Sequence, residues 1–312
     1  MSAYRAALAA LLVVAACDGN PFKPAIGPVN PTVPVDPGGG VTVGNGVTVN
    51  ASVVGNMRSV GFAGNNTDPI QVNINSQDSA MLEGSYVRNP GLDVAGYKAY
   101  TYQETGSNRM LVALVSDRLS SAKGIVAVDG GQFATYHGGG LYARAETFTV
   151  PDDPSGAQGK FNYSGSYVGL LNFGDVVPGG PGGDLDPIQS YRTSGRVLIT
   201  ADFEEMAVSG GIDNRRIVDT GGALATQMLY DGTIDANGNF AGKTQRLDVD
   251  AATGDGRLVD SGNYAGIFAG DNAAEIAALF VFKPIKGDDR AEERGLFTSA
   301  SCTVESGPAC RP

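Results

Sequence analysis

The sequence predicts an all-β protein: a C-terminal eight-stranded antiparallel β-barrel preceded by a smaller β-rich, handle-like subdomain. Three observations support this fold class. Glycine is abundant, with 45 of 312 residues, and tryptophan is absent. Few windows show the 3.6-residue period of a helix. Short runs of alternating apolar and polar residues recur instead, with turn residues about every 8–12 positions, which is typical of sandwiches and barrels.

Residues 1–17 have the form of a lipoprotein signal peptide. Arg5 precedes an apolar run, 6–16, that is too short to span a bilayer. The run ends in VAAC, which resembles a bacterial lipobox and makes Cys17 the candidate lipidation (palmitate) site. The alternative is a plain secretory signal that contains a cysteine. We expect a lipid anchor in the cell envelope, in the outer membrane rather than the inner, although Asp18 leaves the choice of membrane open.

Residues 18–46 form a Pro/Gly-rich tether. Prolines recur every few residues along it, and three consecutive glycines, 38–40, follow them. Proline this dense favours an extended polyproline conformation and prevents a packed core. The tether is expected to hold the folded part away from the membrane.

Residues 47–150 are predicted to form the handle-like subdomain. Five runs with strand character, each bounded by turn residues, lie at 97–103, 109–116, 124–130, 132–138 and 141–150. The segment PDDPSGAQG, 151–159, is expected to be a loop and a domain boundary.

Residues 151–301 are predicted to form the barrel. Its eight expected strands are 160–173, 190–201, 204–213, 224–234, 239–249, 260–269, 275–284 and 293–300. Asn237-Gly238 is a strong hairpin signal between two of them. Eight antiparallel strands can close around side chains alone or around one small ligand, and closure removes exposed edges.

An internal repeat supports the barrel. The pattern N-Y-x-G-x-aromatic-x-G occurs at 162–169 and again at 263–270. On a strand, residues four apart share a face, so each tyrosine lies on the same side as the glycines of its repeat. Tyr163 and Tyr264 are expected at matching corner positions, where glycine relieves crowding under an aromatic ring.

The stretch SGNYAGIFAGDNAAEIAALFVFK, 261–283, has glycines at even spacings of four, which is not the G-x-G-x-x-G spacing of a dinucleotide site. We expect one helical turn at 271–275 and then a strand. Phe268, Phe280 and Phe297 are expected on core faces of adjacent strands.

This stretch, followed by ERGLFTS, resembles the end of the C-terminal barrel of transferrin-binding protein B and related surface lipoproteins. The matching residues are Gly266, Phe268, Gly270, Asn272, Ala273, Glu275, Gly295 and Phe297. The resemblance covers about residues 160–300 and implies a non-enzymatic binding protein. Two departures are that Ala277 and Ala278 replace paired glycines of the family and that one barrel is present instead of two lobes. No transferrin-contacting residue can be carried over.

Composition excludes several function classes. The formal net charge is −11, and no basic patch is interleaved with aromatics, so nucleic acid is not an expected partner. The single histidine, His137, begins an H-G-G-G run, but no G-x-S-x-G elbow accompanies it. A hydrolase therefore ranks last. The acidic runs around Asp202 and Asp255 are interpreted as solvated turns. No metal or resident cofactor is expected.

Cys302 and Cys310 are expected to pair in a disulfide-closed C-terminal tail, 302–312, because export places them in an oxidising compartment. The segment 174–187 is expected to be a flexible surface loop. It either takes part in binding or is an insertion that the fold tolerates.

Two function hypotheses remain. The first is a lipid-anchored, non-enzymatic binding or interaction protein of the cell envelope, whose partner is expected to be a protein or a small ligand. The second is a small-ligand carrier that holds haem or another hydrophobic ligand in the barrel mouth or the subdomain cleft, with His137 and Tyr136 as candidate haem ligands.

Overall fold

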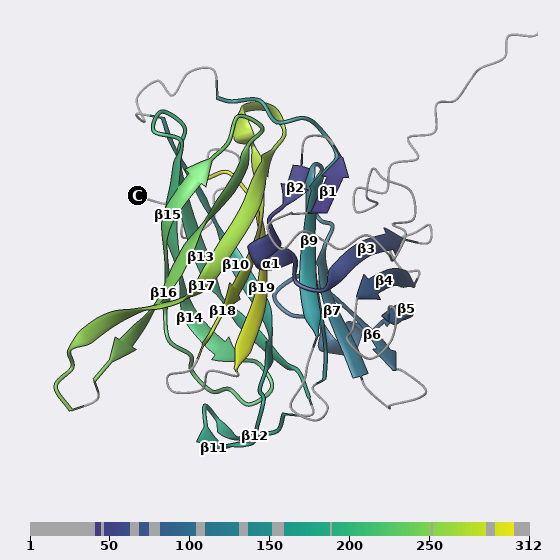
Figure 1. Ribbon diagram of the computed structural model, residues 1–312, viewed down its shortest axis with the longest axis vertical. Helices are drawn as coiled ribbons and strands as arrows, with labels where there is room; N and C mark the ends of the chain where they lie inside the picture. Colours follow the sequence, from purple (N-terminus) through teal and green to yellow (C-terminus); the bar gives the residue numbers. More distant parts are fainter. Residues whose placement is uncertain are drawn as a thin grey trace, which may run out of the picture.

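A computed structural model describes residues 41–44, 47–62, 69–74, 82–103, 110–130, 137–151, 159–187, 189–250, 252–284 and 291–302. Figure 1 shows two β structures side by side, with the closed barrel on one side and the N-terminal sheet on the other. The helical elements among the described residues are short turns: α1 (Ala51–Val54), η1 (Pro90–Leu92) and η2 (Asp271–Ala273). The predicted fold class is confirmed.

The barrel consists of eight antiparallel strands in sequential order, and the last strand pairs with the first to close it. Its strands are β10 (Lys160–Asn172), β13 (Tyr191–Asp202), β14 (Ala207–Ile217), β15 (Gln227–Ile234), β16 (Asn239–Val249), β17 (Gly256–Ala269), β18 (Glu275–Phe282) and β19 (Glu292–Ala300). Each overlaps one predicted strand. The expected helical turn before β18 is the 3₁₀ turn η2, and the expected Asn-Gly hairpin joins β15 and β16.

Several predicted boundaries were wrong. The strand predicted at 204–213 begins only at Ala207, because Asp202 accepts hydrogen bonds from the amides of Glu204 and Glu205 and holds a turn there. β17 begins four residues earlier than predicted. The strand predicted at 141–150 is β9 (Gly138–Arg144). Of the strand predicted at 132–138, residues 132–136 lie outside the described residues.

The N-terminal part is a seven-stranded antiparallel sheet, again in sequential order. It comprises β3 (Met57–Phe62), β4 (Ile70–Ile74), β5 (Leu82–Arg88), β6 (Lys98–Gln103), β7 (Met110–Ser116), β8 (Ala122–Asp129) and β9. An isolated bridge between Gly55 and Gly139 brings the beginning of β3 back to β9, so the sheet nearly closes on itself. A separate two-stranded ribbon, β1 (Val41–Gly44) and β2 (Val47–Val49), precedes it.

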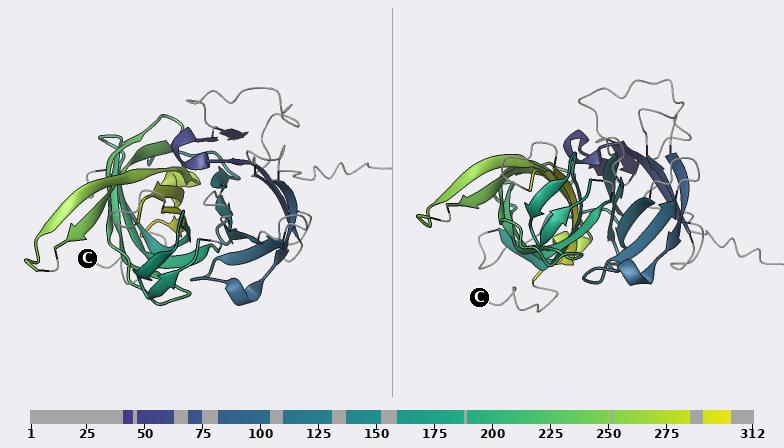
Figure 2. Two further views of the ribbon diagram at one scale, coloured as in Figure 1. Left: turned by 60° about the horizontal axis from the view of Figure 1, so that its bottom comes forward. Right: turned by 90° about the horizontal axis from the view of Figure 1, so that it is seen from below.

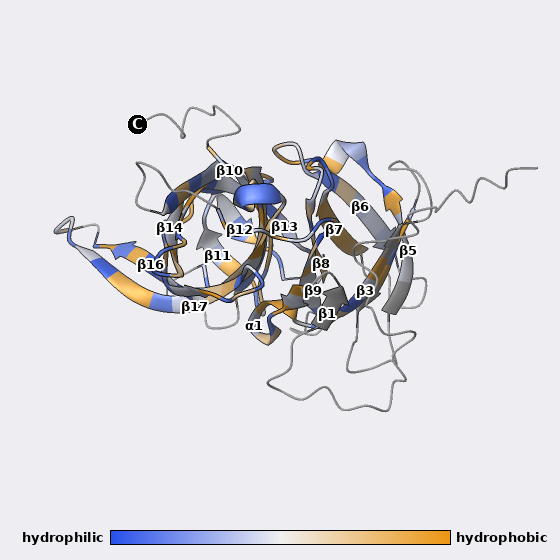
Figure 3. Cartoon of the chain, turned by 90° about the horizontal axis from the view of Figure 1, so that it is seen from above, coloured by the Kyte–Doolittle hydropathy of each residue, from blue (hydrophilic) through white to orange (hydrophobic). Residues whose placement is uncertain are grey.

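The sheet and the barrel share one hydrophobic core. The outward faces of β10, β17, β18 and β19 pack against the N-terminal sheet, so apolar residues of both parts form one cluster. Figure 3 shows hydrophobic residues along β8 and β9, where the two parts meet. Two glycines admit large side chains from the barrel: Leu296 lies against Gly124, and Leu279 lies against Gly140. A side chain at either glycine would overlap these leucines.

Polar contacts fix the same interface. The Tyr97 hydroxyl donates to the Ser166 carbonyl at 2.9 Å and accepts from the Thr298 amide at 2.9 Å. The Glu275 carboxylate, at the start of β18, accepts from the Ser120 hydroxyl and from three consecutive amides, 120–122, of the N-terminal part. The two parts are therefore held by hydrogen bonds as well as by apolar packing.

The inside of the barrel is filled by aromatic side chains. Phe268, Phe280 and Phe297 are fully buried there, on adjacent strands, as predicted. Tyr163 and Tyr264 are also fully buried, and each donates its hydroxyl to a main-chain carbonyl. Glycines make room for the rings: a Cβ at Gly242 would overlap the Tyr264 ring, and one at Gly295 would overlap Tyr167.

The segment expected to be a flexible loop, 174–187, contains a hairpin. Its strands are β11 (Val177–Gly180) and β12 (Gly183–Leu185). Leu185 is buried in a small apolar cluster at the end of the barrel, with Phe173, Tyr191 and Ile217. The hairpin thus covers one end of the barrel, at the bottom of Figure 1. No helix among the described residues is long and apolar enough to cross a membrane.

Candidate functional site

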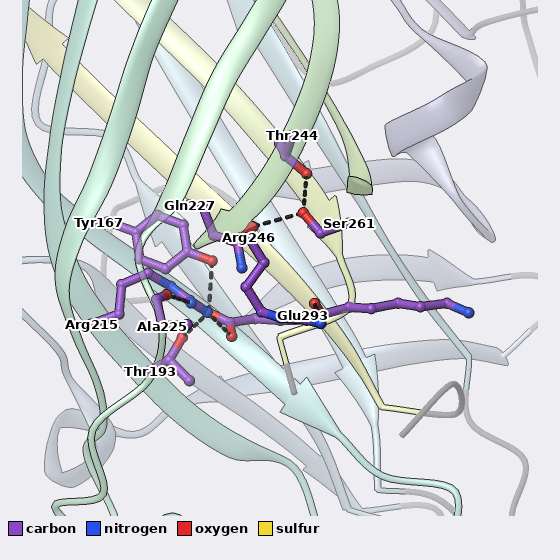
Figure 4. A network of polar contacts seen from close by, with 10 residues as sticks. Tyr167, Thr193, Arg215, Ala225, Gln227, Thr244, Arg246, Ser261 and Glu293 are labelled. Atoms are coloured by element: carbon purple, nitrogen blue, oxygen red, sulfur yellow. Dashed lines mark hydrogen bonds and ion pairs between the residues drawn. The ribbon is translucent and has the colours of Figure 1, made fainter. Parts of the chain in front are cut away.

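A layer of polar side chains lies inside the barrel between two apolar clusters (Figure 4). Along β13, Thr193 follows Tyr191 of the end cluster and precedes Val197 of the aromatic core. Arg215 on β14 and Glu293 on β19 occupy equivalent places between the same two clusters. This connected layer of polar side chains is the first candidate for a site.

Arg215 and Glu293 form an ion pair with both side chains wholly buried. The Arg215 Nη2 to Glu293 Oε2 distance is 2.5 Å. The other carboxylate oxygen accepts from the Tyr167 hydroxyl at 2.8 Å and from the Thr193 hydroxyl at 2.6 Å. The guanidinium also donates to the Ala225 carbonyl and lies 4.7 Å from the centre of the Phe282 ring. Burial of a charge is tolerated when it is paired and hydrogen-bonded in this way.

Tyr167 keeps its proton in this setting. Burial raises the pKa of its hydroxyl well above the ordinary value, and the negative charge of Glu293 raises it further, against an opposing effect of Arg215. The phenol is thus a donor to Glu293 and not a base. This arrangement holds a carboxylate in place; it does not prepare a proton acceptor.

The layer continues across β15, β16 and β17. The Ser261 hydroxyl donates to Gln227 Oε1 at 2.7 Å and lies 2.9 Å from the Thr244 hydroxyl. Nearby, Arg246 bonds Asp248 at 2.6 Å and the Lys283 carbonyl at 2.9 Å. Two buried donors, Arg215 Nε and Gln227 Nε2, have no partner among the described residues. The polar layer is almost fully satisfied by the protein itself, and this supports a structural role.

A pocket of about 330 Å³ lies elsewhere, at the seam between the two parts of the molecule. It is lined by Thr48, Asn50, Ala51, Tyr142, Thr233, Ile234, Asp235, Asn239, Phe240 and Ala241. The β15–β16 hairpin forms one side, and β2 with the start of α1 forms the other. The Thr48 amide donates to Asn239 Oδ1 at 3.3 Å across the seam. The volume is at the lower end of about 300–1,000 Å³ for small-ligand sites.

The structure buries His137, one of the two candidate haem ligands. The side chain lies directly before β9, and its Nδ1 is 3.5 Å from Asp129 Oδ2. Its exposed fraction is 4%, so ligation of an external iron would require the imidazole to leave this environment. Tyr136 lies outside the described residues.

Two further sequence-based sites, the lipidation site and the disulfide, depend on residues that are not described. Cys17 and Cys310 lie outside the described residues, so lipidation and the disulfide stay predictions. Cys302 follows β19, and its amide donates to the Asn162 carbonyl at 2.8 Å. Cys302, the first residue of the predicted tail, thus lies two residues after the last barrel strand.

The acidic runs do not converge. Asp202 is the last residue of β13 and is buried, not solvated as expected, whereas Asp250 and Asp255 lie at the tip of the β16–β17 hairpin. The Asp202 and Asp250 carboxylates accept hydrogen bonds from main-chain amides of the turns that follow them, which is typical of aspartate at a turn. Within the described ranges, no group of three or more histidine, cysteine, aspartate or glutamate residues is arranged to hold a metal ion.

No protein-family model matches the sequence, and neither does any curated protein. Solved structures of transferrin-binding protein B are similar to it. A double mutant of that protein from Haemophilus parasuis Hp5 has 15% sequence identity and a TM-score of 0.39, over 78% of this chain and 54% of that one. The isotype 1 protein from serogroup B Neisseria meningitidis has 14% identity and a TM-score of 0.36, over 84% of this chain and 56% of that one. The chain spans about half the length of these structures.

The buried ion pair gives a direct test of the polar layer. Arg215→Met should lower the free energy of unfolding by about 3–5 kcal/mol, because it leaves the Glu293 charge buried without its partner. The double variant Arg215→Met/Glu293→Gln should recover most of this loss, since no charge remains. Chemical denaturation measures both. The exposed pair Arg196–Asp213 is the control, and Arg196→Met should cause no measurable change. Equal losses in the single and double variants would contradict this role for Arg215.

Proposed function

We propose that this chain is a lipid-anchored binding protein of the cell envelope that recognises a protein partner with its outer surface and performs no catalysis. The observation that carries the proposal is the filled interior of the barrel. An aromatic cluster occupies one part, the polar layer the next, and the end cluster closes it. A carrier barrel keeps an internal chamber for its ligand, and these side chains occupy that space.

The absence of catalysis in this proposal rests on the setting of the titratable groups. The Glu293 carboxylate is neutralised by Arg215 and enclosed by apolar clusters, so substrate has no contact with it. The His137 side chain lies against Asp129, and the residue is only 4% exposed. A general acid or base must reach a reacting group, and neither residue does so.

A small-ligand carrier is the second candidate, favoured by one observation. The seam pocket offers about 330 Å³ at the cleft between the two parts. Its lining combines hydroxyl and amide groups with the buried side chains of Tyr142, Ile234 and Phe240. Haem does not suit this pocket, because His137 is not among the lining residues.

Lipid anchorage predicts a simple fractionation result. Cys17→Ala should move the protein from the membrane fraction to the soluble fraction of its native cells and abolish labelling with a palmitate analogue, because the acyl chains supply the membrane affinity. Cys302→Ala is the matched control and should stay in the membrane fraction. A Cys17→Ala protein that remained membrane-bound with the same labelled mass would contradict the anchor.

Surface recognition predicts that the protein carries no bound small molecule. Native mass spectrometry of protein purified from its own membranes should give the mass of the lipidated chain alone, and haem titration should produce no shifted Soret band. His137→Leu should leave both results unchanged. A one-to-one adduct that survives purification would instead establish the carrier function, and its loss in Thr233→Trp, which fills the seam pocket, would place the ligand there.

A further inference from the structure

The β16–β17 hairpin extends beyond the barrel wall. β15 pairs with β16 only as far as Gln227 opposite Arg246, and β18 pairs with β17 only from Gly262 opposite Phe282. Between these points and the tip, the described strands pair with one another, apart from one hydrogen bond of 3.0 Å from the Leu247 amide to the Thr226 carbonyl before β15. We call residues 246–260 the arm; Figures 1 and 2 show it projecting away from both the barrel and the N-terminal sheet.

The arm exposes aliphatic side chains. Leu247 and Leu258 are directly opposite each other, and Val249 lies two residues further along the same face of β16. Val249 is 60% exposed and Leu258 is 49% exposed. Figure 3 shows hydrophobic residues on this projecting part of β17. These large aliphatic side chains pack into none of the hydrophobic clusters among the described residues. Exposed apolar groups of this kind indicate a surface that a binding partner covers.

The main chain of the arm is equally available along one edge. The Asp250 amide donates to the Asp255 carbonyl, which fixes the alternation of hydrogen-bonded pairs along the ribbon. Leu258 therefore lies in a non-hydrogen-bonded pair with Leu247, and its own N–H and C=O point away from β16. The same holds for Gly256. Among the described residues, no strand pairs with this edge from Gly256 to Asp260.

Such an edge selects an extended chain. A row of outward N–H and C=O groups is complementary to another strand, and flanking side chains then set specificity. Residues 246–260 carry four aspartates and two arginines, and one of these, Arg246, is held by Asp248 and the Lys283 carbonyl. The charge of the arm therefore favours a basic partner.

A second copy of the chain fits this edge less well. Self-pairing would bring together two acidic arms of chains that each have a formal net charge of −11. An edge of five residues also buries much less than the total of about 1,200 Å² found in stable protein interfaces.

We propose that β17 of the arm accepts an extended segment of a partner protein as an added strand, and that this segment alternates aliphatic with basic side chains. The inference rests on the proposed function and assigns it a site. Leu258 supplies the central main-chain pair, and Leu247 and Val249 supply the apolar contact. Asp255 lies on the face opposite Leu258 and faces the basic side chains of the incoming strand, whereas Asp260 shares the face of Leu258.

The test uses the full chain and a fluorescein-labelled peptide of alternating valine and lysine. Fluorescence anisotropy should show saturable binding that weakens as salt rises. Leu258→Pro removes the outward N–H without removing a bond to β16, so it should weaken binding at least tenfold. Leu198→Thr changes an exposed leucine on the barrel wall, outside the arm, and is the matched control with unchanged affinity.

A second peptide keeps the test decisive if Leu258→Pro fails to fold. The same peptide with N-methyl groups along one edge cannot add as a strand, although its charge is unchanged. It should bind the unmodified protein at least tenfold more weakly. Equal binding of both peptides would overturn the proposal, because attraction of charge alone would then explain the affinity. Binding of a valine–glutamate peptide with equal affinity would overturn the charge preference.

Two other occupants are distinguished by Leu258→Pro and by one further variant, Leu258→Thr. A dimer that is seen in sedimentation velocity and is lost in Leu258→Pro would show that a second copy of the chain, and not a partner segment, occupies the edge. Co-sedimentation with phosphatidylglycerol vesicles that is lost in Leu258→Thr would replace it by a lipid surface. Failure of peptide binding overturns the arm assignment alone, whereas a retained small molecule in the native mass spectrum overturns the proposed function.

Discussion

A wall of strands buried on both faces organises this molecule. β17, β18 and β19, with the second half of β10, direct aromatic side chains into the barrel and aliphatic ones into the core shared with the N-terminal sheet. Phe280 faces inward and Leu279 faces outward on the same strand, and both are buried. Neither part presents a solvated face along this wall, so each depends on the other to cover apolar surface.

The inward face of this wall explains how side chains fill the barrel interior. Aromatic residues fill it only because glycines at inward positions, such as Gly242 and Gly295, leave space for the rings. The remaining interior is closed by the Arg215–Glu293 pair and its hydrogen bonds. An interior built this way leaves the proposed recognition to the outside of the molecule, where the seam pocket and the arm are found.

Alternation in the sequence predicted the barrel closely, because inward and outward residues repeat with a period of two. The same rule failed for Arg215. A bulge opposite Gly195 inserts an extra residue in β14, so that Ile212 and Arg215, three positions apart, both face inward. Strict alternation assigns Arg215 to solvent. The sequence signal that remained was Glu293, a charged residue in the inward series with Gly295 and Phe297.

The arm and the pocket were missed for different reasons. Gly254, Asp255 and Gly256 are strong turn signals, and they concealed that Arg257, Leu258 and Val259 continue a strand. The pocket joins residues near position 50 with residues near 235, and no local pattern relates segments so far apart. The predicted anchor rests on a local motif, whereas the predicted disulfide rests on export and on two neighbouring cysteines; both stay predictions.

Native-state hydrogen exchange tests the shared wall most directly. If β18 is buried between two mutually dependent parts, its amides and those of β8 should exchange only through one global opening, with the same free energy and the same dependence on denaturant. Amides of the arm near Leu258 should exchange much faster. Exchange of the β8 amides at a clearly lower free energy, with a smaller denaturant dependence than β18, would show that the N-terminal sheet opens while the barrel stays closed, and would contradict the account.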